Sequence, residues 1–337
     1  MPHTSFTPVD LAGAALSLPV VTLLIAAVLV AILLIATNAQ SASAPALTAG
    51  AAASRHLPEL RAVRGVAIGV IAVFIIDVLV RGYLLDLSDV VSWWRFATPL
   101  FVALVGVCVV LSLVTTRGTT RPESPVSPTA RRTWTSFGPR AGLIGAGIVL
   151  AALVATTVTA GLASSPDGQG RYIWLVIPVP NESGIDPLRT WFYGWAYGVP
   201  VLICTAALAI ATWVTLQRNA ARSFVRPDTV AAERAARRVV AGGVVRIATG
   251  AMLLSLAGAW RLISSAGSGS LLWIMGQNGG QPYDAMWRYG ALADLAGWLA
   301  PFAEIAGFAL LLLVAARRAR VMRSAPRPEF AGVEALR

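Results

Sequence analysis

Seven long apolar runs divide this chain of 337 residues, and no other feature restricts its fold as strongly. A helix needs about 20 mostly apolar residues to cross the hydrocarbon core of a bilayer. Because that core offers no water to backbone polar groups, a spanning segment satisfies them within its own helix. The sequence therefore predicts an all-α, polytopic integral membrane bundle of seven transmembrane helices, at residues 15–36, 65–82, 97–116, 141–163, 193–216, 239–260 and 291–316.

Few charged residues accompany these runs. Charged residues make up only 13% of the chain and hydrophobic residues 56%, whereas soluble domains contain about 25% charged residues. A soluble chain of this length usually divides into two domains, but here the apolar runs recur from one end to the other. We therefore predict a single transmembrane domain over residues 1–337, with a Pro/Arg-rich loop at 117–140 and a basic tail at 317–337.

The distribution of arginine predicts the orientation of the bundle. All 27 basic residues are arginine, and 20 of them fall in 37–64, 117–140, 217–238 and 317–337, on one side of the predicted bundle. Because cytoplasmic loops carry the excess of basic residues, we predict an outside amino terminus and a cytoplasmic carboxyl tail. The same arginines attract anionic lipid headgroups on the cytoplasmic side. The net charge of +11 thus follows from topology and predicts no nucleic-acid partner.

The first apolar run resembles a signal peptide in one respect, because the small residues at 37–46 (TNAQSASAPA) look cleavable. The run exceeds 20 residues and has no positively charged segment before it, so we expect an uncleaved first helix. A chain rich in Ala, Gly and Arg that lacks Lys is typical of a GC-rich bacterial genome. We therefore predict the cytoplasmic (inner) membrane of a bacterium as its location.

The six later helices are predicted to form three hairpins. Each hairpin returns through an aromatic-rich segment, and Pro99, Pro200 and Pro301 follow at intervals of 101 residues. This spacing fits three diverged repeats, but the outward-running arms of the hairpins do not align at the same interval. The preference of aromatic residues for the membrane interface and the tolerance of proline in a first helical turn explain it without repeats, and this is the favoured interpretation. In both interpretations the tryptophans predict an outer aromatic belt, formed by Trp93, Trp94, Trp191, Trp195, Trp287 and Trp298.

The residue inventory excludes several membrane mechanisms. Without a lysine the chain cannot carry a retinal Schiff base, and its only histidines, His3 and His56, lie outside the predicted spans. Haem ligation across helices, histidine-based zinc sites and Ser–His catalysis in the membrane are therefore excluded. We expect no cofactor, no metal and no enzymatic activity. The acids of the outer loops are interpreted as solvated; they are Asp86, Asp89 and Asp284.

Ionisable side chains inside spans are rare and costly, and indicate function by default. Four candidates lie inside the predicted spans, Asp77, Arg246, Asp294 and Glu304, and Arg81 and Arg261 stand at helix ends. At about 1.5 Å per helical residue, Asp77 lies roughly 20 Å from the cytoplasmic Arg64, and Glu304 roughly 20 Å from Arg317. Arg246 lies closer to the cytoplasmic boundary, where it can extend toward the headgroups as a snorkelling or lipid-facing cation.

The directions of the side chains connect two of these acids with a cation. Helical side chains lean toward their own amino terminus, so Glu304 leans outward, toward the level of Arg81. Asp77 and Arg81 are four residues apart and share a helix face. We therefore predict an intramembrane ion cluster of Asp77, Arg81 and Glu304, which requires the second and seventh helices to be neighbours. The favoured interpretation is a structural cluster that fixes helix register, and the alternative is a coupling or substrate site.

Three classes of function remain open. A membrane subunit or scaffold, binding other membrane proteins, is favoured by the sparse polarity of the spans and the lack of a catalytic constellation. A small-solute transporter or permease-like component would use the Asp77, Arg81 and Glu304 level as its site. A seven-helix sensor would bind a ligand under the outer loops at 164–190 and 261–290.

Overall fold

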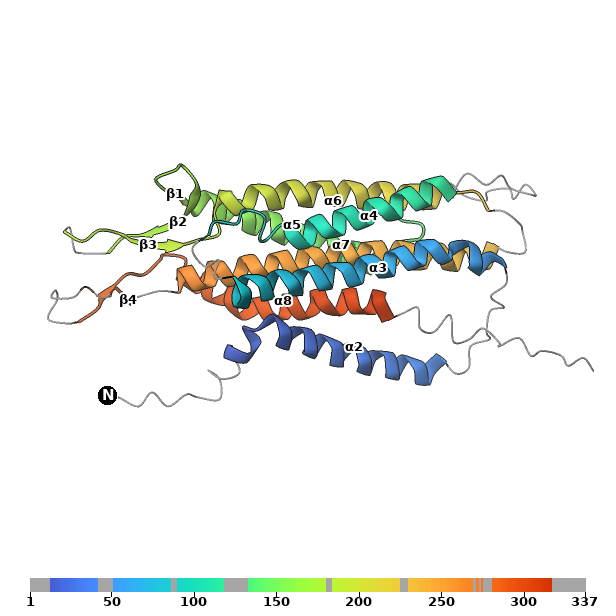
Figure 1. Ribbon diagram of the computed structural model, residues 1–337, viewed down its shortest axis with the longest axis horizontal. Helices are drawn as coiled ribbons and strands as arrows, with labels where there is room; N and C mark the ends of the chain where they lie inside the picture. Colours follow the sequence, from blue (N-terminus) through green and yellow to red (C-terminus); the bar gives the residue numbers. More distant parts are fainter. Residues whose placement is uncertain are drawn as a thin grey trace, which may run out of the picture.

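The computed structural model describes residues 13–41, 51–85, 90–117, 133–179, 184–224, 230–268, 271–272, 274 and 281–316. Seven helices in this part of the chain are long and apolar enough to cross a membrane. They are α2 (Pro19–Ser41), α3 (Ala51–Leu79), α4 (Thr98–Arg117), α5 (Arg140–Ala163), α6 (Trp195–Ala221), α7 (Val230–Gly267) and α8 (Gly290–Ala316). All seven run roughly along the long axis of the molecule (Figure 1). The prediction of a multi-pass helical membrane protein is confirmed.

The two ends of the bundle differ (Figure 1). Short strands cover one of them, which we call the strand end: β1 (Ser165–Pro166), β2 (Tyr172–Ile177), β3 (Leu188–Trp191), β4 (Leu271–Leu272) and β5 (Tyr283–Asp284). At the opposite end α2, α4, α6 and α8 finish and α3, α5 and α7 begin. We call it the arginine-rich end, because the arginines of residues 217–238 flank its helices.

Helix α7 is the centre of the bundle. It packs against α3, α4, α5, α6 and α8, and it is the most buried of the seven helices, whereas α2 and α5 lie at the periphery. Small residues make this close packing possible. A Cβ added to Gly250 of α7 would lie 3.0 Å from the carbonyl oxygen of Gly307 on α8. A Cβ added to Gly307 would lie at the same distance from the carbonyl oxygen of Gly250.

Two helices extend well beyond their predicted spans. α7 runs from Val230 to Gly267, past both ends of the predicted 239–260, and α3 begins at Ala51, well before the predicted 65–82. The predicted spans end at charged residues. In the structure several of those charges, including Glu59 and Arg237, are buried against partners elsewhere in the fold, so the helices continue through them.

The strands were not anticipated by the sequence analysis. β1, β2 and β3 form an antiparallel sheet in that order, and β4 pairs with β5. In β2 the alternate residues Ile173, Leu175 and Ile177 are buried, as a strand with one covered face requires. A short apolar run of this kind is ambiguous between strand and helix in the sequence. The sheet places Trp191, its last residue, over the strand end of the bundle.

The three evenly spaced prolines occupy different positions in their helices. Pro99 is the second residue of α4, Pro200 the sixth of α6 and Pro301 the twelfth of α8. Backbone N–H groups in the first turn of a helix have no partner within the helix, so a proline there costs no hydrogen bond. A proline further inside removes one of the backbone hydrogen bonds of the helix. The prolines therefore do not mark equivalent positions in the three hairpins.

Candidate functional site

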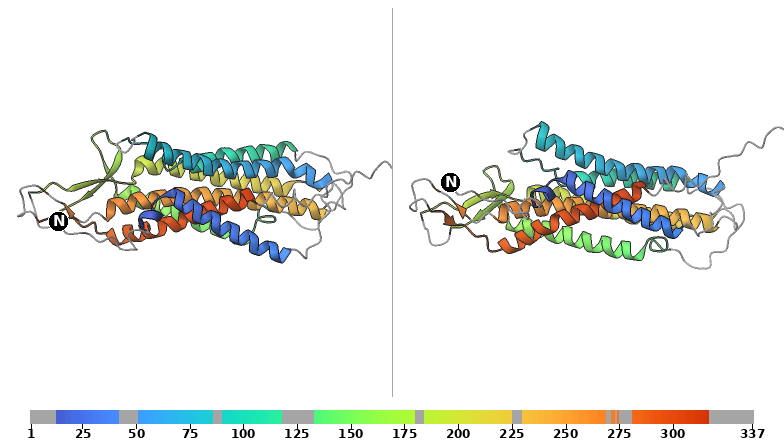
Figure 2. Two further views of the ribbon diagram at one scale, coloured as in Figure 1. Left: turned by 60° about the horizontal axis from the view of Figure 1, so that its bottom comes forward. Right: turned by 90° about the horizontal axis from the view of Figure 1, so that it is seen from below.

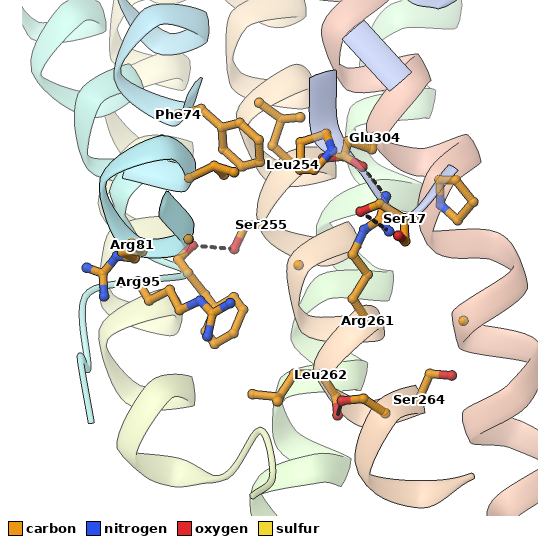
Figure 3. A pocket seen from close by; sticks show the side chains of 18 of the residues that line it. Ser17, Phe74, Arg81, Arg95, Leu254, Ser255, Arg261, Leu262, Ser264 and Glu304 are labelled. Carbon is orange, nitrogen blue, oxygen red and sulfur yellow. Dashed lines mark hydrogen bonds and ion pairs between the residues drawn. The ribbon is translucent and has the colours of Figure 1, made fainter. Parts of the chain in front are cut away.

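A cavity of about 1370 Å³ lies inside the strand half of the bundle. Its walls come from the start of α2, the end of α3, the segment 90–99, and the strand halves of α7 and α8. Along α8 it reaches from Asp294 to Glu304, a separation of about 15 Å for a helix that rises 1.5 Å per residue. Figure 3 shows Arg81 and Arg95 on one side of it and Ser17, Arg261 and Glu304 on the other.

The course of α3 creates this space. Phe74 of α3 packs edge-to-face on Phe308 of α8, with 5.5 Å between ring centroids, so the two helices are neighbours there. Toward the strand end α3 stands apart from α2 and α8 (Figure 2). α2 packs along α8 and barely touches α3. α3 continues into a π-helical turn, η1 (Val80–Leu84), a feature that often occurs at functional sites.

The segment between α3 and α4 forms a fixed wall of the cavity. The Ser255 hydroxyl on α7 donates a hydrogen bond of 2.8 Å to the carbonyl oxygen of Phe96. The Phe96 ring packs edge-to-face on Tyr193 and Tyr197, at centroid distances of 5.1 and 5.3 Å. These contacts anchor the backbone that carries Arg95 into the lining of the cavity.

The first ion pair of the cavity joins Asp77 and Arg81. The Nε of Arg81 donates to Asp77 Oδ1 at 2.8 Å, across one helical turn. The side chains of Asp77 and Arg81 remain 24% and 14% exposed. The guanidinium of Arg81 also lies 5.7 Å from the ring centroid of Trp94. A cation at this separation attracts the ring through a cation–π contact. Asp77 and Arg81 therefore lie on one helix face and contact each other, as their spacing predicts.

The second ion pair joins Glu304 to Arg261 of α7, not to Arg81. The Glu304 side chain is only 2% exposed, and Arg261 also donates to the carbonyl oxygens of Leu16 and Ser17, at 2.9 and 3.0 Å. Arg261 follows directly after the predicted span 239–260. Because α7 continues to Gly267, Arg261 instead lies within the helix and faces α8 and the start of α2.

Two charged residues of the lining make no ion pair with the residues that the structure describes. Arg95 lies 5.3 Å from the Phe96 ring centroid as a cation–π contact. Burial and then the positive charge of Arg81 lower the pKa of Arg95, and the charge of Asp77 acts in the opposite direction. Asp294, on α8, is exposed. The wall formed by α3 and residues 90–97 thus carries two cations and one carboxylate, Asp77.

The other predicted residues are dispersed. Arg246 is half-buried in α7, and its Nη1 lies near Gly242, one turn toward the arginine-rich end. Of the six belt tryptophans, three are exposed: Trp93, Trp94 and Trp298. The other three are partly buried at the strand end: Trp191, Trp195 and Trp287. Asp86, Asp89 and the side chain of Asp284 lie outside the described residues.

A second polar network, which the sequence analysis missed, lies at the arginine-rich end. Arg222 binds both carboxylate oxygens of Glu59, at 2.8 and 3.1 Å, and its Nε donates to the Val114 carbonyl oxygen at 3.0 Å. His56 contacts the same carboxylate at 3.2 Å. The buried Arg237 donates to the carbonyl oxygen of Arg222. Nothing in the sequence indicates this network. Its arginines resemble ordinary loop arginines, and the contact between Arg222 and Glu59 joins positions 163 residues apart.

No family model, curated protein or solved structure matches this chain. Among the described residues no three His, Cys, Asp or Glu side chains form a group that could hold a metal ion. The strand-end cavity is therefore the candidate functional site, by its geometry and its charged lining.

Proposed function

We propose that this protein is a small-solute transporter or permease-like component that binds a solute with an acidic group in the strand-end cavity. The observation that supports this is Arg95, which lines a cavity of about 1370 Å³ and forms no ion pair with a carboxylate among the described residues. Arg81 beside it uses only its Nε for Asp77. Guanidinium groups bind carboxylates and phosphates through strong, charge-assisted hydrogen bonds.

We further propose that the protein lies in the cytoplasmic membrane of a bacterium with its strand end and amino terminus outside. The excess of arginine at the opposite end supports this orientation. It brings the arginine-rich end against the anionic headgroups of the inner leaflet. The cavity then faces the outside, and a solute reaches Arg81 and Arg95 before it reaches Glu304.

The two ion pairs have different roles in this proposal. Asp77 holds Arg81 in place, and Arg81 and Arg95 together bind the acidic group. The Arg261–Glu304 pair joins α7, α8 and the start of α2 at the deep side of the cavity. A solute that crosses the protein has to pass this level. Rearrangement of this ion pair would therefore open the path. In this proposal the pair both holds the helices together and couples their movement to the passage of the solute.

A binding and flux experiment tests the proposal. A panel of radiolabelled carboxylic acids and organophosphates is screened with purified protein and with proteoliposomes. Arg95→Gln should weaken binding about 10- to 100-fold, because a hydrogen bond to a charged group contributes about 1.5–3 kcal/mol. Arg189→Gln, which removes an exposed arginine of β3 outside the cavity, is the matched control. Uptake unaffected by Arg95→Gln would refute the proposal.

A membrane subunit or scaffold is the second candidate. The outer face of α5 supports it, because small side chains recur there at every fourth residue and are exposed: Gly147, Ala151, Ala155 and Thr159. Such a stripe lets a helix of another protein approach closely. Partner chains that co-purify in mild detergent and are released by Ala151→Leu would favour this function. A ligand sensor would use the same cavity as the transporter, and binding without flux would favour it.

A further inference from the structure

The strand-end cavity is only partly enclosed by the bundle. It lies between α3 on one side and α2 with α8 on the other, and α2 barely touches α3. Trp298 and Phe302 line the cavity from α8 and are 66% and 60% exposed. They are four residues apart, so they share a face of the helix. Both belong to a helix that is long and apolar enough to span a membrane, and in a spanning helix such exposed aromatic side chains would meet lipid.

The lining changes in character with depth. The exposed Trp93 and Trp94 precede α4 and mark the membrane interface, where tryptophan is enriched. Arg81 lies against the Trp94 ring, so the guanidinium groups of Arg81 and Arg95 are at the level of lipid headgroups. Deeper in the bundle the lining includes Phe74, Val78 and Leu254. The α3 side of the cavity, with Arg81 and Arg95 against Asp77, is therefore cationic at headgroup level, whereas Asp294 lines the α8 side. Below this level the lining is largely apolar.

The deep charges do not alter this pattern. Glu304 and Arg261 neutralise each other, and the carboxylate is almost completely buried. The volume of the cavity, about 1370 Å³, is also large. Ordinary small-molecule sites reach only roughly 1000 Å³. A compact soluble acid would use only the cationic part of such a space, whereas a molecule with an anionic head and a long apolar body would use all of it.

We infer that the ligand is an amphiphile of the outer leaflet, with a phosphate or carboxylate headgroup bound by Arg81 and Arg95 and an apolar chain along Trp298 and Phe302. This inference is based on the proposed function and specifies its substrate class. The ligand reaches the site from the side, between α3 and α8, without leaving the membrane. The same headgroup chemistry could instead come from a soluble anion, so the experiment has to separate the two sources.

The test measures binding of dioleoyl phosphatidylglycerol and of glycerol phosphate, its soluble headgroup, to the detergent-purified protein by native mass spectrometry. Dioleoyl phosphatidylcholine is the matched lipid without net charge. We expect one phosphatidylglycerol per chain, bound at least tenfold more tightly than either other compound. Arg95→Gln should weaken its binding at least tenfold, Arg95→Lys should retain most of it, and Arg189→Gln should leave it unchanged.

Three other outcomes of the binding experiment would contradict the inference, the proposed function or both. If glycerol phosphate binds as tightly as the lipid and depends on Arg95, the inference fails and the proposed function stands. If the lipid binds equally to wild type and Arg95→Gln, it occupies the general lipid surface and the inference fails. If no compound of the acid panel or of this set depends on Arg95, both proposals fail.

The position of the apolar chain is tested separately. Phosphatidylglycerol with brominated acyl chains quenches tryptophans that it contacts, and one equivalent is added to the protein in detergent. Trp298→Phe should reduce the quenched fraction of the fluorescence. Trp134→Phe, which alters an exposed tryptophan at the arginine-rich end, should leave it unchanged. Equal quenching of wild type and Trp298→Phe would place the chain elsewhere and overturn this part of the inference.

Discussion

Removal of the Arg261 side chain should destabilise the folded protein strongly, because it leaves the carboxylate of Glu304 buried without a cationic partner. Glu304 is 2% exposed, and loss of one member of a buried ion pair costs about 3–5 kcal/mol. The stranded carboxyl can instead take up a proton. At pH 7 that costs about 3.7 kcal/mol, from a usual glutamate pKa near 4.3 and about 1.36 kcal/mol per pH unit. The two arguments agree on the size of the effect for Arg261→Met.

The pH dependence of this effect has a definite sign. In Arg261→Met the folded protein keeps Glu304 protonated, whereas the unfolded chain loses that proton above about pH 4.3. Stability is therefore recovered as the pH falls toward that value and lost as it rises. Between pH 7 and pH 5.5 the destabilisation should shrink by about 2 kcal/mol. The double variant Arg261→Met/Glu304→Leu should recover most of the loss at every pH, because no charge remains to be stranded.

The assay is equilibrium unfolding with sodium dodecyl sulfate in mixed micelles, and Arg81→Met is the matched control. Its partner, Asp77, is 24% exposed, so breaking that pair should cost no more than about 1 kcal/mol. An equal loss in Arg81→Met and Arg261→Met would favour the pairing of Glu304 with Arg81 that the sequence predicts. A loss below about 1 kcal/mol in Arg261→Met at pH 7 would refute the argument from burial.

Three further predictions concern other parts of the molecule. Arg222→Met should cost about 3–5 kcal/mol in the same unfolding assay, because it removes the guanidinium from the buried carboxylate of Glu59 and leaves His56 against it. Gly250→Val should destabilise α7–α8 packing by about 1–3 kcal/mol, since even its Cβ meets the α8 backbone at 3.0 Å, and Gly145→Val, on open helix surface, is its control. Although desolvation opposes them, hydrogen bonds from Arg171 and Gln169 lower the pKa of Asp167. Protonation of Asp167 should therefore loosen the turn at 167–171, so that its amide protons exchange faster below about pH 4, near the usual aspartate pKa. Asp167→Asn should abolish this pH dependence of the exchange rate.

Much of the fold is predictable because the membrane restricts it. Four of the seven spans agree with their predicted bounds within two residues at one end or both, and α4, α5 and α8 do so at both. The largest differences are in α3 and α7, where helical turns continue through residues such as Glu59 and Arg237. Charges end a predicted span when they are assumed to be solvated. Here they are buried with partners from other segments of the chain, which a count of local hydropathy cannot detect.

The site was predictable only in part. Asp77 and Arg81 pair across one helical turn, so their contact follows from local spacing. The partner of Glu304 depends on how α7 and α8 are rotated against each other. The nearest cation in depth was Arg81, but the continuation of α7 beyond residue 260 brings Arg261 to the carboxylate.

The sequence by itself determined the class of this protein, because about 20 apolar residues can cross a bilayer only as a helix. It also excluded a retinal Schiff base, since no lysine is present. Only the tertiary structure decided which charges meet and where the bundle is hollow. Those features depend on the divergence of α3 from α2 and α8 and on the close approach of Gly250 to Gly307. Both result from packing between residues far apart in the chain, where local periodicity carries no information.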